Sequence, residues 1–137
     1  MFPELEVLVV LETLFSLSGT NKLNIRSNRM ESNNYQLLAY KTANKELNPY
    51  DQLRNAVYGL NGESGEVIDI LKKHEFQGHE LNVPKLVDEL GDVAWYLALA
   101  CTALSITLDD VMQHNIDKLR SRYPEGFDSD RSIHREE

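Results

Sequence analysis

Residues 53–71 read LRNAVYGLNGESGEVIDIL, and their apolar side chains recur every three or four positions. That period places side chains on one face of an α-helix. The apolar members are Leu53, Ala56, Val57, Leu60, Val67, Ile70 and Leu71. The stretch therefore predicts one long amphipathic helix over residues 51–74.

Start and stop signals divide the neighbouring sequence into three further helices. We predict them over residues 35–47, 84–105 and 107–121. The first has polar capping residues at 32–34 and must end before Pro49, because the residue before a proline disfavours the α conformation. Pro84 suits a first helical turn, and Thr107-Leu108-Asp109-Asp110 has the form of a capping box. Because the sequence contains no convincing strand pairs, we predict an all-α, four-helix bundle-like domain.

The domain boundaries follow from where the regular helical pattern begins and ends. Residues 1–29 carry a dense apolar patch and then a polar stretch. Two interpretations stay open for them: a helix that packs on the core or on a partner, or an extension outside the domain proper. We favour the extension, because the pattern from Met30 onward is complete without it. We therefore predict a domain over residues 30–127 and a polar tail over 128–137.

Composition and charge limit the function. The chain has 137 residues, enough for one compact domain, and a formal net charge of −8. Such an acidic chain is unsuited to binding nucleic acid polymers, because that binding needs a basic protein surface. The lone Cys101 allows no intramolecular disulfide, and no cationic leader precedes an apolar run, so we expect a cytoplasmic protein. The most apolar window, residues 5–17, is too short to span a membrane.

Four carboxylates form two short repeats, Glu63-Ser64-Gly65-Glu66 and Glu89-Leu90-Gly91-Asp92. Acids three residues apart lie on neighbouring flanks of one helix face, and a helical wheel puts both pairs beside the apolar stripe. Carboxylates gathered there need a positive partner, because burying a charge is costly and like charges raise each other's pKa. All-oxygen ligands suit Mg²⁺ or Mn²⁺. The repeats therefore predict a divalent metal site.

Other interpretations of these acids fit less well. A ferritin-like di-iron site uses Glu-x-x-His on two helices, and this pattern does not occur here. The histidines His74, His79, His114 and His134 are scattered, and the Cys/His cluster of a zinc site is missing. The acids could instead be surface charges paired with Lys72, Lys73 or Lys85. Two such repeats on adjacent helices, each containing a glycine, favour the metal site.

These motifs resemble the MazG-like nucleoside triphosphate pyrophosphohydrolases of the all-α NTP pyrophosphatase superfamily. The resemblance covers residues 35–127 and rests on GLNGESGEV at 59–67, DELGDVAWY at 88–96, and the stretch 115–127 with its closing RYPEGF. It implies Mg²⁺-dependent hydrolysis of a nucleoside or deoxynucleoside triphosphate to the monophosphate and pyrophosphate, with Mn²⁺ as an alternative ion. Residues 1–29 are the part of the chain that the resemblance does not cover.

The resemblance also implies roles for individual residues. The metal ligands would be Glu63, Glu66, Glu89 and Asp92. Either Glu63 or Glu66 could accept the proton of the attacking water, and the sequence does not decide between them. The phosphate contacts would come from Asn115, Lys118, Arg122 and Tyr123, with Lys73 as a further candidate. Three of these, Asn115, Lys118 and Arg122, share a helix face if that helix continues through residue 122.

Members of this family usually form homodimers or homotetramers, in which subunits pack together to complete the bundle and the nucleotide pocket. Two alternative functions stay open beside the leading one. The chain could be a phosphoribosyl-ATP pyrophosphohydrolase-like enzyme, or a non-catalytic helical oligomer that binds nucleotide or metal. The base and sugar of the substrate cannot be read from the sequence, because they depend on the shape of the pocket.

Overall fold

The structure is a computed structural model, and it describes residues 30–134. These residues contain no strand and form the helices α2 (Ser32–Lys41), α3 (Pro49–Gln77), α4 (Val83–Ala103), α5 (Leu108–Arg122) and α6 (Ser129–Ile133). All five helices belong to one compact unit, Ser32–Glu137. The predicted all-α class is therefore confirmed. The predictions for residues 1–29 lie outside the described residues.

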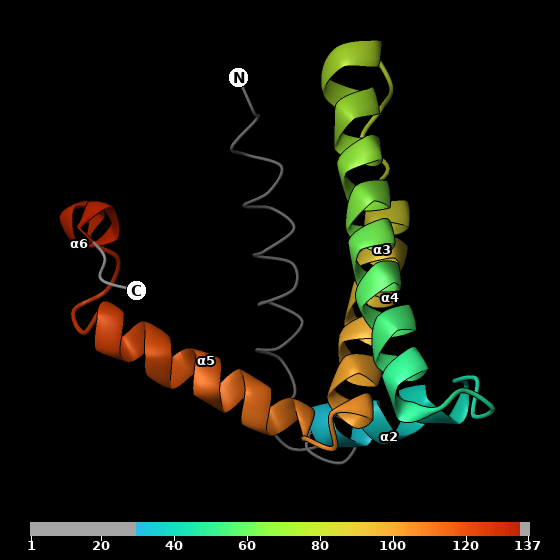
Figure 1. Ribbon diagram of the computed structural model, residues 1–137. Helices are drawn as coiled ribbons and strands as arrows, with labels where there is room; N and C mark the ends of the chain where they lie inside the picture. Colours follow the sequence, from blue (N-terminus) through green and yellow to red (C-terminus); the bar gives the residue numbers. More distant parts are fainter. Residues whose placement is uncertain (1–29, 135–137) are drawn as a thin grey trace, which may run out of the picture. The chain divides into compact units, whose positions relative to one another are not determined.

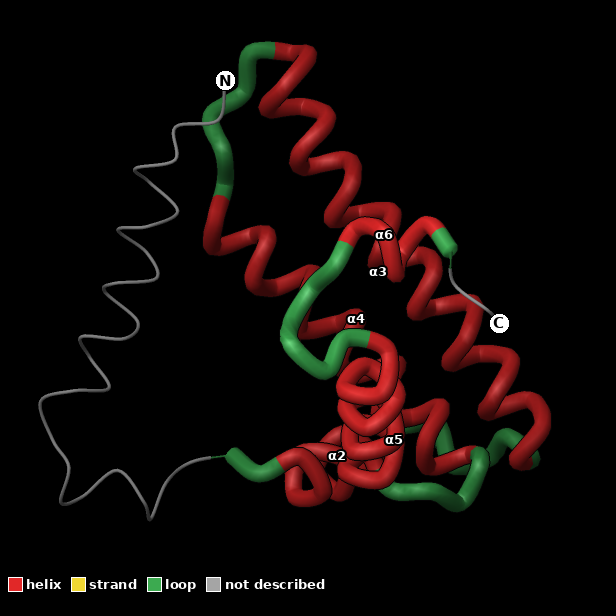
Figure 2. The backbone as a smooth tube through the Cα atoms, turned by 90° about the vertical axis from the view of Figure 1, so that its left-hand side faces the viewer, coloured by secondary structure: helices red, strands yellow, loops and turns green. Residues whose placement is uncertain are grey.

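The two longest helices, α3 and α4, run antiparallel and side by side (Figure 1). Figure 2 shows the same pair joined at one end by a short loop. Capping residues at the helix ends determine where the two helices of this hairpin begin and where α3 ends. The side chain of Asn48 accepts a hydrogen bond from Asp51 N at 3.0 Å to cap α3, and Gly78, with φ 73°, ends it in the left-handed conformation that glycine favours. Asn82 then caps α4 by accepting from Lys85 N at 3.0 Å.

The first helix differs from its prediction: α2 covers Ser32–Lys41, not residues 35–47. Proline at 49 does not end it. Thr42 ends it instead, because its hydroxyl donates to Ala39 O at 2.8 Å and competes with the helical ladder. The same hydroxyl accepts from Trp95 Nε1 on α4 at 2.9 Å. A long-range contact therefore helps to fix the end of this helix.

The start of α5 is held by α2. Thr107 and Asp110 form the predicted capping box, which is confirmed. Two side chains of α2 add to it: Asn33 Oδ1 accepts from Asp109 N at 3.1 Å, and Gln36 Oε1 accepts from Leu108 N at 2.7 Å. Asn33, which was expected to cap its own helix, thus satisfies a free N–H group of another helix, and Gln36 does the same from the next turn of α2. From this junction α5 turns 102° away from the direction of α4.

The buried apolar core is small and lies at this junction. Its buried members are Ala39, Ala98, Cys101 and Leu108, and Tyr35, Trp95 and Val111 pack against them. Large apolar side chains elsewhere stay exposed, among them Val87 and Leu90 on α4 and Ile116 and Leu119 on α5. Exposed apolar surface on this scale is typical of chains that associate. The described part of one chain therefore does not close a four-helix core by itself.

The described part of the predicted polar tail contains a short helix. After α5, Gly126 takes φ 97° within the predicted Pro/Gly turn, and residues Ser129–Ile133 form the short helix α6. Asp128 begins this helix by accepting a hydrogen bond from Arg131 N at 3.0 Å. Among the described residues, no single helix is long and apolar enough to cross a membrane; only the bent pair of α4 and α5 passes that test, on length and composition alone.

Candidate metal centre

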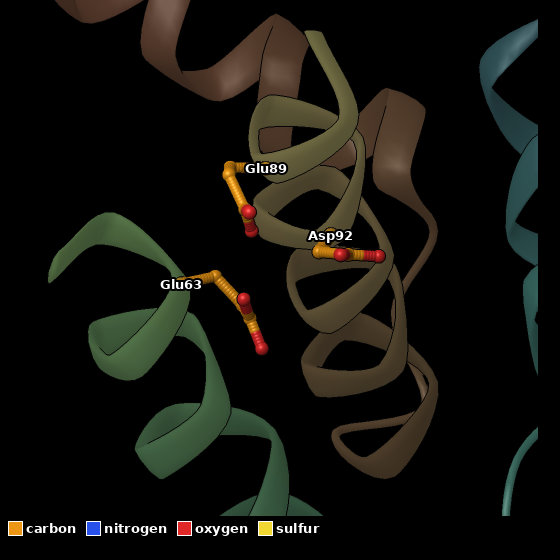
Figure 3. A group of neighbouring side chains, drawn as sticks. All are labelled: Glu63, Glu89 and Asp92. Atoms are coloured by element: carbon orange, nitrogen blue, oxygen red, sulfur yellow. The ribbon is translucent and has the colours of Figure 1, made fainter. Parts of the chain in front are cut away.

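Three of the four predicted carboxylates meet between α3 and α4. Glu63 comes from α3, and Glu89 and Asp92 come from α4 (Figure 3). One oxygen of each lies within 4.8 Å of the others. The antiparallel hairpin explains this meeting, because it brings the middle of α3 beside the N-terminal half of α4. Acids from both four-residue repeats of the sequence thus form one cluster in space.

The cluster runs from the helix interface toward solvent. Glu89 is 7% exposed, whereas Glu63 is half-buried and Asp92 is exposed. Loss of water around Glu63 raises its pKa, and the negative charges of Asp92 and Glu89 raise it further. The three acids therefore repel each other in the absence of a cation, and a cation bound among them would relieve that repulsion.

Lys85 reaches the cluster from the first turn of α4. Its Nζ lies 2.5 Å from Glu89 Oε1, and the Lys85 side chain is 56% exposed. The hydrogen bond to Glu89 is the main reason that the pKa of Lys85 is raised. Sequence analysis named Lys85 only as a surface partner of the acids. The four-residue spacing from Glu89 was the available signal, but burial of Glu89 could not be known from it.

Tyr35 on α2 is a second neighbour that sequence analysis missed. Its hydroxyl lies 3.4 Å from Gly91 O, next to Asp92. Partial burial raises the pKa of Tyr35, and the negative charge of Asp92 adds to this effect. No local pattern could reveal this approach, because the two residues are 56 positions apart in the chain.

Glu66 stands apart from the group of three. Its side chain is exposed and does not belong to the set of oxygens within 4.8 Å. It is still close enough for its charge to raise the pKa of Glu63 and of Lys85. Its predicted role as a fourth ligand stays a prediction.

The predicted phosphate contacts lie away from the cluster. Lys73 Nζ lies 2.5 Å from Asp69 Oδ2, and Lys72 Nζ lies 2.6 Å from Asp69 Oδ1. These hydrogen bonds lower the pKa of Asp69 to about 2. The positive charge of Lys73 is thus already engaged by an acid outside the cluster.

The candidates on α5 are not brought to the acids within one chain. These are Asn115, Lys118, Arg122 and, directly after the helix, Tyr123. Across residues 30–134, no side-chain hydrogen bond or ion pair joins them to α3 or α4. The ring of Tyr123 packs instead against the ring of Phe127, with the two ring centroids 5.6 Å apart. The 102° turn before α5 explains the separation.

The chemistry of the cluster fits a hard divalent cation. It offers carboxylate oxygens only, and Mg²⁺ and Mn²⁺ prefer such ligands. No histidine or cysteine belongs to the group, so the soft or mixed donor set of a zinc site is not present there. The glycines inside the two repeats make no close contact among residues 30–134, because a Cβ placed at Gly65 or Gly91 would meet nothing within 4 Å there.

Comparisons with known proteins bear on this site. Residues 52–127 match the family described as "MazG nucleotide pyrophosphohydrolase domain". The chain is also similar to the "Gene 37 protein" of Mycobacterium phage L5, with 35% identity over 100 residues that cover 67% of this chain and 88% of the phage protein. No solved structure matches the chain. The family match includes all of the clustered carboxylates.

Proposed function

Because the chain belongs to the MazG nucleotide pyrophosphohydrolase domain family, we propose that it hydrolyses a nucleoside or deoxynucleoside triphosphate with the help of Mg²⁺. Water is added across the bond between the α- and β-phosphates, which yields the monophosphate and pyrophosphate. The observation that carries the proposal is the meeting of Glu63, Glu89 and Asp92 within 4.8 Å.

Each carboxylate has a task in this proposal. Glu63, Glu89 and Asp92, with Glu66 as a fourth ligand, hold the Mg²⁺ ions. When bound, the ions neutralise the triphosphate and lower the pKa of a water molecule. Glu63 or Glu66 accepts the proton that this water loses as its oxygen attacks phosphorus.

We further propose that a second copy of the chain completes the site. The cations and amide on α5 lie away from the acids of their own chain, and α5 turns 102° from α4. Apolar side chains on α4 and α5, such as Val87, Leu90 and Ile116, are exposed and need a cover. In a homodimer or homotetramer, α5 of one copy would lie on the α3–α4 pair of another, with Asn115, Lys118, Arg122 and Tyr123 near the phosphates.

The substrate class follows from charge. With a net charge of −8, the protein suits a small phosphorylated ligand carried with metal ions, not a nucleic acid polymer. A cytoplasmic location, where such substrates are found, is part of the proposal.

One experiment tests the activity. The purified protein is incubated with Mg²⁺ and a panel of triphosphates that includes canonical and modified deoxynucleotides and phosphoribosyl-ATP, and the phosphate products are identified. We expect release of pyrophosphate from at least one of them, and loss of at least ~100-fold in rate in Glu63→Gln. Release of single phosphate, or no release from any member of the panel, would refute the proposal. Activity that survives Glu63→Gln would refute the assignment of the site.

A further inference from the structure

The carboxylate cluster already holds one positive charge, the ammonium group of Lys85. Across the described residues 30–134, Lys85 is the one lysine, arginine or histidine within ion-pair distance of any of the three acids. Its Nζ lies on Glu89 Oε1 at 2.5 Å. Three carboxylates face a single ammonium, so the cluster still needs positive charge.

The backbone of Lys85 is fixed in place. Its N–H donates to the capping side chain of Asn82 at 3.0 Å, and Pro84 restricts the chain directly before it. The Cα of Lys85 is therefore anchored one helical turn before Glu89, while its side chain is more than half exposed and free to rotate out. With its backbone anchored and its side chain exposed, Lys85 can place its ammonium group at the cluster and move it away again.

Helix energetics do not explain why a lysine stands here. A positive charge in the first turn of a helix opposes the helix dipole, and α4 has no acidic residue in that turn to offset it. Lysine placed four residues before glutamate is also the less favourable order for a helical ion pair. The reason for Lys85 must therefore lie in the cluster, where Glu89 is 7% exposed and its charge would otherwise be buried without a partner.

We propose that Lys85 is a positioning residue that neutralises Glu89 in the metal-free protein and competes with the divalent metal for it. The inference rests on the proposed function, because it requires the metal to bind at these acids. Metal binding would break the contact between Lys85 Nζ and Glu89 Oε1 and return the ammonium to water. The protein thereby keeps an ordered cluster without metal and binds the metal less tightly than the bare acids would.

The test compares metal binding with stability in the full-length protein. Calorimetric titration with Mn²⁺ is carried out on wild type and on Lys85→Gln, which removes the charge but keeps a polar side chain. We expect Mn²⁺ to bind Lys85→Gln about twofold to fivefold more tightly, the range that corresponds to a partly exposed ion pair. We also expect a lower Tm for metal-free Lys85→Gln and a larger rise in Tm on adding Mn²⁺.

Two control variants keep the result specific. Lys85→Arg retains the charge and should bind Mn²⁺ about as weakly as wild type. Lys72→Gln removes an equally exposed lysine whose partner, Asp69, lies outside the cluster. Lys72 is nine residues beyond Glu63 on the same helix, so it lies about 13 Å further along the axis, beyond the range of unscreened charge effects at physiological salt. It should change Mn²⁺ affinity by less than about twofold.

The outcomes separate this inference from the proposed function. If wild type binds Mn²⁺ and Lys85→Gln binds it equally or more weakly, the competition is refuted and Lys85 merely supports the ligands. Tighter binding that also appears in Lys85→Arg would refute a role for the charge. If none of the proteins binds Mn²⁺, the metal site itself is refuted, and this inference with it.

Discussion

The ring of Tyr96 on α4 fills the place that a side chain would take at Gly59 on α3. A Cβ added at Gly59 would lie 2.2 Å from Tyr96 Cε1 and Cζ, far inside van der Waals contact. Gly59 comes four residues before Glu63 and Tyr96 four residues after Asp92, so in an antiparallel pair this contact lies one helical turn from the carboxylate cluster. The close approach therefore sets the spacing of the two helices that hold the acids.

Gly59→Ala should destabilise the protein. Overpacking at such a contact costs roughly 1–3 kcal/mol, and the better helix propensity of alanine offsets about 1 kcal/mol of this. The variant should also bind metal more weakly, because Tyr96 or the helix must move. Denaturant unfolding and Mn²⁺ titration measure the two effects.

Gly62→Ala is the matched control on the same helix. A Cβ at Gly62 would meet nothing within 4 Å in the part of the chain that the structure describes, so we expect only helix propensity to change and the variant to gain about 0.5–1 kcal/mol. Equal stability of the two alanine variants would contradict the packing of Gly59 against Tyr96.

Gln36→Ala should loosen the junction of α2, α4 and α5. The Gln36 amide accepts from Leu108 N at 2.7 Å and donates to Thr102 Oγ1 at 3.1 Å and to Ile106 O at 3.0 Å. Removing it leaves these groups without that partner, at a cost of roughly 1–3 kcal/mol in the free energy of unfolding. Thermal unfolding measures the loss.

Gln113→Ala provides the comparison for Gln36. Among the described residues 30–134, the Gln113 side chain bonds only to Asp117 one turn along α5, at an exposed position, so its loss should cost no more than about 0.5 kcal/mol. Similar losses in both variants would show that the network around Gln36 does not hold the junction.

The sequence predicts the local features of this fold well and the long-range ones poorly. Capping at Thr107 and the Pro/Gly turn containing Gly126 depend on neighbours in the chain, so both could be recognised. The end of α2 was less predictable, because the Thr42 hydroxyl that ends this helix also accepts a hydrogen bond from Trp95, 53 residues away in the chain. Local rules assign Asn33 to its own helix, whereas its side chain caps α5.

The candidate site likewise has local features that the sequence predicts and long-range features that it does not. Helical period places acids such as Glu63 and Glu89 beside the apolar stripe, and the structure brings them together. Which acid is buried, and which lysine pairs with it, depends on how two helices pack. For that reason sequence analysis named Lys85 only as a surface partner of the acids and missed Tyr35, although both lie at the cluster.

Glu63→Gln should make the metal-free protein more stable at neutral pH. Burial and the nearby acids raise the pKa of Glu63 above its ordinary 4.5, so the folded state binds its proton more tightly than the unfolded state does. Stability therefore falls as pH rises from 4.5 through the raised pKa, and the full penalty remains above it. Glutamine carries no charge and escapes this penalty.

The measurement is Tm against pH without metal. The advantage of Glu63→Gln over wild type should be largest at neutral pH and disappear below about pH 4.5, where Glu63 is protonated in both states. Glu75→Gln, at an exposed glutamate of the same helix, corrects for net charge. Adding Mg²⁺ should raise the Tm of wild type but not of Glu63→Gln. A metal-free Glu63→Gln less stable than Glu75→Gln at pH 7 would contradict the repulsion within the cluster.

Two inactive variants should restore activity to each other if a second copy completes the site. Glu63→Gln damages the acids, and Arg122→Ala removes a cation that α5 carries away from the acids of its own chain. In a mixed dimer, one site combines intact acids from one subunit with an intact Arg122 from the other, while the second site carries both changes. Random exchange of equal amounts makes half of the dimers mixed, so about a quarter of wild-type activity should return.

The restoration distinguishes the two arrangements because it depends only on which chain supplies Arg122. If acids and Arg122 act within one chain, each subunit of the mixed dimer carries one defect, and no site is intact. Coexpression of the two variants with different affinity tags, followed by purification on both tags, isolates the mixed species, which should show about half of wild-type activity. Activity in the mixed species no higher than in the separate variants would contradict the shared site and place Arg122 either in its own subunit's site or outside catalysis.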